Sequence, residues 1–295
     1  MVIFISDHVR VSGTLIGLAI GDAFGAPLEG LPPPCERVTE MLPGGRFPRR
    51  KGEVTDDTLQ AIAVAESLLA CHGFNPDDLM HRLIAMYRRS PQWFGPTSSK
   101  VFTLVITGTP VSDAACVAHE QTGSSRSNGS VMRGFPIGAL YAPDSAYDVS
   151  IACSQLTHYD PVAAHASAFL NLMVSRMCRG RTRESAFQAA AAACRNGEVM
   201  RVLGSYKDYF PDPSLDALLC SHAALHCFMH AGSFEEALVT AVNLGGDADT
   251  IGACCGALSG ACWGAEAIPE RWIRVLEDRS RISRVAQELA GAAED

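Results

Sequence analysis

Two short acidic clusters hold the side chains of this sequence that are best suited to chemistry. The first reads Val-Thr-Asp-Asp-Thr at residues 54–58 and the second Gly-Gly-Asp-Ala-Asp-Thr at residues 245–250, and each leads into an apolar, helix-like stretch. Ionised carboxylates that are forced together share either a proton or a cation. Carboxylate and hydroxyl oxygens suit Mg²⁺, Mn²⁺ or Ca²⁺ better than Zn²⁺, which more often takes histidine or thiolate ligands.

The same clusters also have the composition of helix N-termini. Thr and Asp side chains accept hydrogen bonds from the free amides of a first helical turn, where negative charge is favoured. Caps explain one acidic residue per helix well, but they explain the adjacent pair Asp56 and Asp57 less well. The residues alone therefore leave two alternatives of equal weight, helix caps and a composite metal site.

Two other metal-binding patterns are weak. An EF-hand loop starting at Asp247 is excluded, because Ile251 and Leu258 stand where oxygen ligands are required. Three histidines follow one another at a spacing of four residues, but no His-Glu-x-x-His frame accompanies them: His222, His226 and His230. A partly buried helix face is the favoured interpretation of these histidines.

The loop Ser-Ser-Arg-Ser-Asn-Gly-Ser at residues 124–130 is a candidate phosphate cradle. Hydroxyls, exposed backbone amides and an arginine together can hold a phosphate, although a solvent-exposed loop has the same composition about as often. The sequence contains no Gly-x-Ser-x-Gly elbow, Walker loop or dinucleotide fingerprint.

The elements that must position these residues are helices. Residues 53–70 have apolar positions at helical spacing, and residues 75–78, 160–161 and 233–236 have the composition of helix starts. Residues 101–107 are the best candidate strand and could equally be helical. With 295 residues, 47% hydrophobic and 19% charged, and no obvious linker, the chain is expected to form one compact domain, 1–295, in an all-α orthogonal helix bundle.

Two runs of glycine predict close helix packing. Glycine recurs at every fourth position in two stretches: Gly13, Gly17, Gly21 and Gly25, then Gly252, Gly256, Gly260 and Gly264. A glycine inside a helix costs about 1 kcal/mol relative to alanine, so packing must offset it. We expect both helices to be central and to pack against each other, which would hold the two ends of the chain in one domain.

Composition restricts the location and the partners. The formal net charge of −8 and the absence of long Lys/Arg runs argue against nucleic-acid binding; Arg49-Arg50-Lys51 is too short a run and reads as solvated charge. Met1 to Ile5 is too brief for a signal peptide, and no uninterrupted apolar stretch reaches about 20 residues. The eleven cysteines read as core residues in a reducing compartment. A cytoplasmic monomer is expected.

Five motifs, taken in order, resemble those of the ADP-ribosylglycohydrolases over roughly residues 10 to 275. They are Gly21-Asp22-Ala23-Phe24-Gly25 with Glu29; Thr55-Asp56-Asp57-Thr58; Ser127-Asn128-Gly129 with Met132-Arg133; Thr157-His158; and Gly245-Gly246-Asp247-Ala248-Asp249-Thr250. The resemblance implies an all-α domain of that family's type with two divalent cations, Mg²⁺ or Mn²⁺. It also implies hydrolysis of the bond between the ribose anomeric carbon of ADP-ribose and an acceptor, so the expected partner is an ADP-ribosylated protein or an ADP-ribose derivative.

The resemblance also implies roles for individual residues. The metal ligands would be Thr55, Asp56, Asp57, Asp247, Asp249 and Thr250, and the catalytic group would comprise Glu29, Asp56, Asp57 and Asp249. Substrate would be bound by Gly95, Ser124, Ser125, Arg126, Ser127, Asn128, Gly129 and His158, with residues 124–127 at the diphosphate and Asn128 and His158 at the ribose. An anionic, metal-braced site suits this reaction, because glycoside cleavage builds positive charge on the sugar.

One departure bears on the substrate. Nitrogenase-associated members carry an aspartate two positions before a glycine, where this chain reads Gln92-Trp93-Phe94-Gly95. Phe94 matches other members, which argues against a nitrogenase-regulating role and weakens the case for arginine as the acceptor. The acceptor stays open among an arginine nitrogen, a serine oxygen, an acetyl ester and a nucleic-acid end. For Trp93 and Phe94, core packing is favoured over contact with substrate. Two alternatives remain: a non-catalytic, ADP-ribose-binding or crystallin-like relative, and a magnesium-dependent phosphohydrolase.

Overall fold

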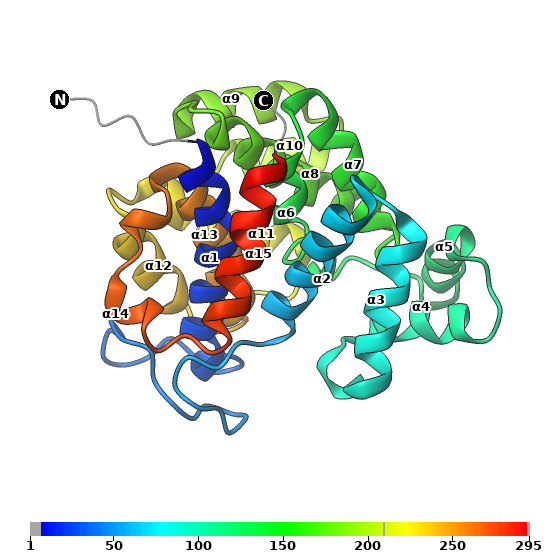
Figure 1. The fold of residues 1–295 in the computed structure, drawn as a ribbon, viewed down its shortest axis with the longest axis horizontal. Helices are drawn as coiled ribbons and strands as arrows, with labels where there is room; N and C mark the ends of the chain where they lie inside the picture. The colour runs from blue at the N-terminus through cyan, green and yellow to red at the C-terminus, as the bar shows by residue number, and fades with distance from the viewer. Residues whose placement is uncertain (1–6, 209, 294–295) are drawn as a thin grey trace.

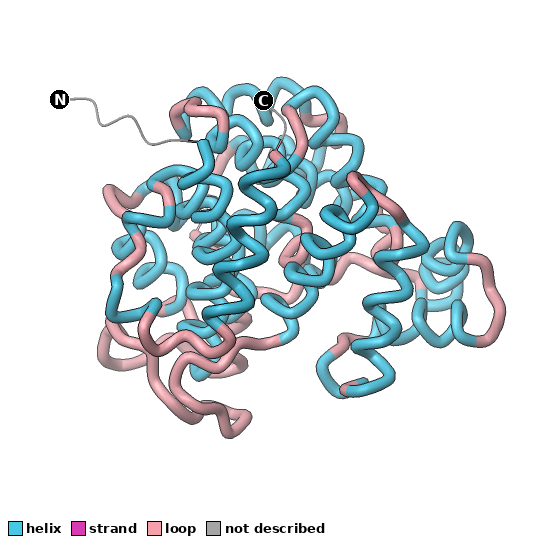
Figure 2. Tube along the Cα trace, viewed as in Figure 1, coloured by secondary structure: helices cyan, strands magenta, loops and turns pink. Residues whose placement is uncertain are grey.

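The computed structural model describes residues 7–208 and 210–293, so Met1 to Ile5 lie outside the described residues. These residues form fifteen α-helices and four short 3-10 helices, with two isolated bridges and no strand among them (Figures 1 and 2). The all-α prediction is confirmed. The α-helices are α1 (Asp7–Gly25), α2 (Asp56–Cys71), α3 (Pro76–Arg89), α4 (Pro96–Ile106), α5 (Val111–Thr122), α6 (Phe135–Leu140), α7 (Pro143–Gln155), α8 (Pro161–Cys178), α9 (Arg183–Ala193), α10 (Gly197–Gly204), α11 (Ala217–His230), α12 (Phe234–Val242), α13 (Ala248–Trp263), α14 (Glu270–Ile273) and α15 (Arg279–Ala292), and the 3-10 helices are η1 (Ala26–Leu28), η2 (Pro91–Trp93), η3 (Asn128–Ser130) and η4 (Ala265–Ala267).

Helices α1 and α13 form the centre of the molecule and touch along their glycines, as predicted. A Cβ atom on Gly21 would lie 1.9 Å from the carbonyl oxygen of Gly252, and one on Gly256 would lie 2.1 Å from that of Gly17. Neither position leaves room for any side chain. The backbones therefore approach as closely as they do because both helices present glycine.

The remaining helices surround this pair. Helix α15 lies beside α1, α12 and α11 pack on α13, and α8 contacts α1, α11 and α13 (Figure 1). One apolar cluster of buried side chains runs from Val11 to Ala290. Helices α3, α4 and α5 lie together at one end of the molecule, next to α2 (Figure 1). The two ends of the chain thus contribute to one core.

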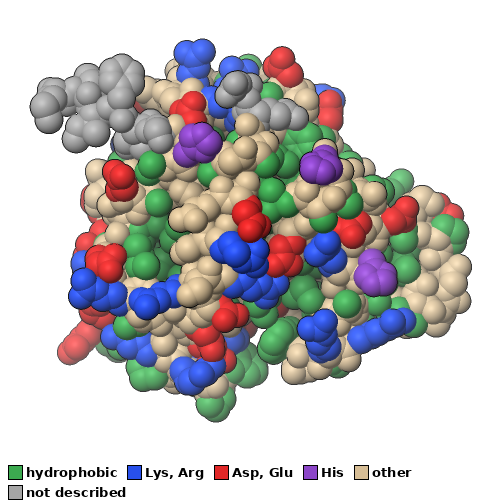
Figure 3. All heavy atoms as spheres, in the orientation of Figure 1, with side chains coloured by type: hydrophobic (Ala, Val, Ile, Leu, Met, Phe, Trp, Pro, Cys, Tyr) green, Lys and Arg blue, Asp and Glu red, His purple; other side chains and the backbone are tan. Residues whose placement is uncertain are grey.

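Helix α1 is buried rather than exposed to lipid. Residues 7–28 are long and apolar enough to cross a membrane by length and composition, a feature that the count of uninterrupted apolar residues had missed. However, 89% of the apolar 18-residue stretch within this segment is buried inside the protein. On the face seen in Figure 3, acidic and basic side chains are interspersed, and ion pairs such as Arg281 with Glu66 at 2.9 Å are frequent. Helix α1 is thus the core helix of a globular protein.

The predicted helix starts are largely confirmed. Asn75 caps α3 by accepting hydrogen bonds from two amides, and Asp160 caps α8. Ser233 caps α12 through the Glu236 amide, while the Glu236 carboxylate accepts from the amide of Gly232 rather than from that of Ser233. The strand interpretation of residues 101–107 is wrong, because residues 101–106 complete helix α4, which starts at Pro96, and Thr107 is its C-cap. Within this run only the neighbours Val101 and Phe102 are buried, which does not match the alternation of a half-buried strand, where neighbours point to opposite faces.

Candidate active site

The two acidic clusters, about 190 residues apart in sequence, meet at the starts of α2 and α13. Burial is the main cause that raises the pKa of Asp57 well above its usual range, and the charges of Asp22, Asp56 and Asp247 raise it further. The pKa of Asp249 is raised for the same reasons: burial is the largest cause, followed by the charges of Asp57 and Asp247. These carboxylates therefore lie within electrostatic reach of one another in a buried setting.

The cap interpretation holds for one threonine only. Thr55 is the N-cap of α2: its hydroxyl accepts from the Asp57 amide at 3.1 Å and donates to Asp57 Oδ2 at 3.1 Å. Asp247 occupies the N-cap position of α13, but within the described chain its side chain caps no amide and instead accepts a hydrogen bond from Asn128 Nδ2. Helix capping therefore does not account for the aspartates.

Three carboxylate oxygens in this group are buried without a hydrogen-bond partner among the described residues: Asp22 Oδ1, Asp57 Oδ1 and Asp249 Oδ1. A buried acceptor left without a donor is costly unless something else satisfies it. Burial also raises the pKa of Asp56 to about 7 and that of Asp247 to about 6. The described side chains therefore do not supply enough hydrogen-bond donors or positive charge to satisfy this cluster.

Asp22 is a site residue that the sequence analysis did not assign. Its Oδ2 accepts from the backbone amides of Thr55 at 2.8 Å and Thr58 at 3.2 Å, and from the Thr58 hydroxyl. Burial raises the pKa of this fully buried group to about 6. Asp22 therefore ties the start of α2 to α1. The available signal was a lone carboxylate between the closely spaced glycines of an apolar helix.

A cavity of about 540 Å³ opens beside the cluster. Eleven predicted site residues line it: Glu29, Asp56, Asp57, Gly95, Ser127, Asn128, Gly129, His158, Asp247, Asp249 and Thr250. Thr55 is buried behind Asp57, where it holds that carboxylate. The cavity is of the size that binds small organic ligands.

Three residues predicted to hold a diphosphate do not line this cavity: Ser124, Ser125 and Arg126. The buried Ser125 hydroxyl contacts His119 Nδ1 at 2.8 Å and accepts from the Asp160 amide at 2.9 Å. Arg126 donates to Asp216 at 2.7 Å and to Glu198 at 2.8 Å. The loop has the composition of a phosphate cradle, but the Ser125 and Arg126 side chains hold the protein together instead.

His158 is buried at the end of a hydrogen-bonded chain. Arg133 Nη2 donates to the Thr157 hydroxyl, which contacts His158 Nδ1 at 2.7 Å, and His158 Nε2 lies 2.9 Å from Ser127 Oγ. Burial, followed by the nearby Arg133 charge, lowers the pKa of His158 to about 3. Because the guanidinium can only donate, we infer that Nδ1 accepts from Thr157 and that Nε2–H donates to Ser127. His158 is therefore a neutral positioning group.

Arg133 also reaches the acidic cluster. Its Nη1 donates to Gln60 Oε1 at 3.2 Å, and Gln60 Nε2 donates to Asp56 Oδ2 at 2.9 Å. Gln60 and Arg133 are both buried, and sequence reasoning gave neither of them a role. Through these contacts one buried arginine orients both His158 and Asp56.

A tight turn brings Glu29 beside the second cluster. Gly246 forms a bridge with Leu31, and its amide donates to the Leu31 carbonyl at 2.8 Å while Gly30 donates back at 2.7 Å. Gly246 has a φ of +61°, and a Cβ there would lie 2.2 Å from the Pro213 carbonyl oxygen. Only glycine fits this turn. The Glu29 charge contributes to the raised pKa of both Asp247 and Asp249.

Comparison with known proteins agrees with this geometry. The family model described as ADP-ribosylglycohydrolase matches residues 6–295. The chain belongs to the ADP-ribosylglycohydrolase family. It is 28% identical to the ADP-ribosylarginine hydrolase Tri1 of Serratia proteamaculans, covering 95% of this chain and 78% of that one. It is also 28% identical to the ADP-ribosyl-[dinitrogen reductase] glycohydrolase of Rhodospirillum rubrum, covering 92% of each chain.

A solved structure shows the same family fold. A chain titled "ADP-ribosylglycohydrolase-related protein complex" matches with a TM-score of 0.84 and 32% identity, covering 98% of this chain and 99% of that one. The family resemblance drawn from the motifs is therefore confirmed. Family and relatives together support an ADP-ribosyl hydrolase activity.

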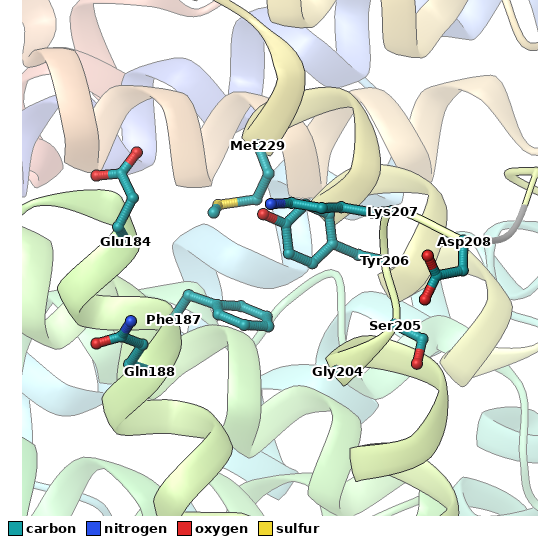
Figure 4. A pocket seen from close by; sticks show the side chains of 9 residues that line it. All are labelled: Glu184, Phe187, Gln188, Gly204, Ser205, Tyr206, Lys207, Asp208 and Met229. Atoms are coloured by element: carbon teal, nitrogen blue, oxygen red, sulfur yellow. The ribbon is translucent and has the colours of Figure 1, made fainter.

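Two other features of the molecule lie apart from the acidic cavity. His222, His226 and His230 follow one face of α11, where the last two rings are in tilted contact with centroids 4.3 Å apart. Two of these histidines make hydrogen-bond contacts within the fold, because His226 Nδ1 lies 2.8 Å from the Tyr206 carbonyl oxygen and His230 Nδ1 lies 2.8 Å from the His226 carbonyl oxygen. These contacts support the interpretation as a packed helix face. A second cavity of about 310 Å³ is lined by residues of α9 and α11 and by residues 204–208 (Figure 4). The rings of Phe187 and Tyr206 pack edge to face there at 5.0 Å.

The stability of the metal-free protein is expected to fall as pH rises from about 4 to about 7. Between the usual aspartate pKa of 3.8 and the raised values of about 6 for Asp22 and about 7 for Asp56, the folded chain binds more protons than the unfolded chain. Stability therefore decreases with pH across that window. His158 acts in the opposite direction below its usual value of 6.5, because its folded pKa is about 3. Burial also lowers the pKa of His165 and that of His222, so three histidines act against five aspartates with raised pKa values.

Thermal melting in EDTA from pH 5 to pH 8 tests this expectation. The melting temperature should decline toward pH 8, and the decline should be smaller with saturating Mg²⁺ or Mn²⁺. A melting temperature that rises steadily over this range in EDTA would contradict the expectation.

Proposed function

We propose that this protein is a metal-dependent hydrolase that removes ADP-ribose from a modified acceptor by cleaving the glycosidic bond at the ribose anomeric carbon. The observation that carries the proposal is the buried carboxylate group, with unpartnered oxygens on Asp22, Asp57 and Asp249, opening onto a cavity of about 540 Å³. Its location in an ADP-ribosylglycohydrolase family member gives the cavity a substrate class.

The donor set fits hard divalent cations. Six residues would hold two of them, and all offer oxygen: Thr55, Asp56, Asp57, Asp247, Asp249 and Thr250. Among the described residues no three His, Cys, Asp or Glu side chains are already arranged around one metal position, so these ligands would turn toward the cations on binding. The unpartnered oxygens and raised pKa values support this assignment, because a bound cation would satisfy the oxygens and favour the ionised forms.

The cations and the residues around them have different proposed roles in the reaction. When bound, the cations supply Lewis-acid polarisation and a lowered pKa for an attacking water. Glu29, which lines the cavity beside Asp247, is placed to accept the proton of that water or to assist departure of the acceptor. At the end of the cavity assigned to the ribose, neutral His158 positions the Ser127 hydroxyl and Asn128 positions the Asp247 carboxylate by hydrogen bonds. The acidic wall stabilises positive charge that develops on the sugar.

The acceptor that we propose to test first is arginine. One relative is named an ADP-ribosylarginine hydrolase, and the cavity carries Glu29 and Glu53 in addition to its aspartates, which would favour a cationic acceptor. The stretch from Gln92 to Gly95 lacks the aspartate of nitrogenase-associated members, so a nitrogenase-regulating role is not proposed. A cytoplasmic location and a monomeric state stay predictions.

A panel of substrates tests the proposal. The purified protein is incubated with peptides carrying ADP-ribose on arginine or serine, and with O-acetyl-ADP-ribose, each in Mg²⁺, Mn²⁺ or EDTA. Chromatography should detect free ADP-ribose from at least one substrate with metal and none with EDTA. Release of inorganic phosphate instead would support a phosphohydrolase. Binding of ADP-ribose without turnover of any substrate would support the non-catalytic alternative.

Trp93 and Phe94, adjacent in sequence, are expected to respond differently to truncation. Phe94 is 7% exposed and packs edge to face on Phe102 at 5.3 Å, as predicted, whereas Trp93 is 45% exposed and lines the cavity, so its assignment to the core is wrong. Phe94→Ala should destabilise the fold by about 3 kcal/mol. Trp93→Ala should change stability by less than about 0.5 kcal/mol and weaken ADP-ribose binding at least about fivefold, since its ring is free to stack on a base.

Denaturant unfolding and calorimetric titration with ADP-ribose check this pair. Trp93 would be only a surface ring if its removal left the ADP-ribose dissociation constant unchanged.

A further inference from the structure

Arg49 is the one cationic side chain among the described residues that line the acidic cavity. It lies on the loop between η1 and α2, and sequence analysis took it for solvated charge. Its side chain is 18% exposed, and its Nε is buried without a hydrogen-bond partner in the described part of the chain. A cavity lined by six carboxylates that nevertheless keeps one arginine is suited to a ligand that carries an anion as well as a sugar.

The present partner of Arg49 is Glu29, and the contact is loose. Arg49 Nη2 lies 3.4 Å from Glu29 Oε2, longer than the roughly 2.7–2.9 Å of a tight charge-assisted hydrogen bond. Glu29 is 29% exposed, so solvent weakens the pair further. By contrast, Arg126 has two tight pairs, at 2.7 and 2.8 Å, and lies outside the cavity. Of the two arginines, Arg49 gives up less by turning to a new anion.

We propose that Arg49 binds the diphosphate of ADP-ribose, and that in doing so it releases Glu29 to act on the water or the acceptor. This inference rests on the proposed function, because it takes ADP-ribose as the ligand. A diphosphate offers oxygens in the spacing that the planar guanidinium contacts with two donors at once, and the unpartnered Nε supplies one of them. Arrival of the anion then changes the partner of Glu29, so the carboxylate becomes free only when substrate is present.

Calorimetric titration of ADP-ribose tests the assignment in saturating Mg²⁺. Arg49→Gln should raise the dissociation constant about 10- to 100-fold, the usual range for losing hydrogen bonds to a charged group. Arg49→Lys should lose less, because the charge remains and only the fork is lost. The matched control is Arg46→Gln, since Arg46 lies on the same loop and over the same Phe47 ring as Arg49 but does not line the cavity. It should stay within about twofold of the unaltered protein.

A double-mutant cycle tests the exchange of partners. Glu29→Gln should tighten ADP-ribose binding a few-fold, because Arg49 then has no carboxylate to leave. In the Arg49→Gln background the same change should have no such effect; an equal gain in both backgrounds would mean general repulsion by Glu29 and would overturn the exchange. Circular dichroism confirms that each variant is folded.

The outcomes separate this inference from the proposed function. If the unaltered protein binds ADP-ribose and Arg49→Gln binds it equally well, the Arg49 assignment is overturned and the function stands. If Arg126→Gln weakens binding instead, the loop at residues 124–127 holds the diphosphate and the assignment is again overturned. If the unaltered protein does not bind ADP-ribose with any metal, the proposed function fails and this inference fails with it.

Discussion

Asp57→Asn is expected to abolish release of ADP-ribose while making the metal-free protein more stable. Asp57 is buried, and burial together with the charges of Asp22, Asp56 and Asp247 raises its pKa well above the usual range. At pH 8 its ionisation therefore opposes folding, and a neutral amide of the same shape removes that penalty. Each kcal/mol gained corresponds to roughly 2–4 °C of melting temperature. Loss of a proposed metal ligand should lower kcat/KM at least about 100-fold.

Three measurements distinguish the loss of a metal ligand from a general loss of folding in the Asp57→Asn variant. Melting in EDTA should give a higher midpoint for the variant, melting in Mg²⁺ or Mn²⁺ should show a smaller metal-induced rise, and turnover should be lost. The control is Asp148→Asn, an exposed carboxylate paired with Arg195 that does not line the cavity, which should change none of the three. Normal turnover by Asp57→Asn would remove Asp57 from the proposed ligands.

Gly256→Leu is expected to prevent folding. A Cβ at this position would lie 2.1 Å from the carbonyl oxygen of Gly17, and a backbone atom cannot move aside as a side-chain tip can. Helices α1 and α13 would have to separate, which exposes the core and moves Asp22 away from Asp249. The loss should exceed about 4 kcal/mol, at the upper end of single substitutions.

The matched control is Gly291→Ala. Gly291 is also a helical glycine, in α15, but a Cβ there would meet nothing within 4 Å. Because alanine favours helix, this change should leave the protein equally stable or up to about 1 kcal/mol more stable. Circular dichroism and chemical denaturation of both variants measure the difference. A folded Gly256→Leu protein with unaltered stability and turnover would show that α1 and α13 need not touch.

Much of the fold followed from local signals. The caps at Asn75 and Asp160 and the two glycine series depend on residues a few positions apart, whose contacts a helix fixes. Residues 101–107 were ambiguous because the run is too short to distinguish a period of 2 from one of 3.6. The capping box at Ser233 formed with a shifted partner, Gly232, because the reach of a glutamate side chain spans more than one amide.

The sequence by itself determined which chemistry was available: paired aspartates with hydroxyls, a glycine seam to bring them together, and motifs of a known family. Only the tertiary structure decided which charges face the cavity. Arg126 turned to Asp216 and Glu198, Arg49 turned inward, and Trp93 remained exposed. It also made His158 neutral and Asp22 part of the cluster. These outcomes depend on contacts between residues tens to hundreds of positions apart and on burial, because the direction of a side chain and its desolvation are set by whatever packs around it.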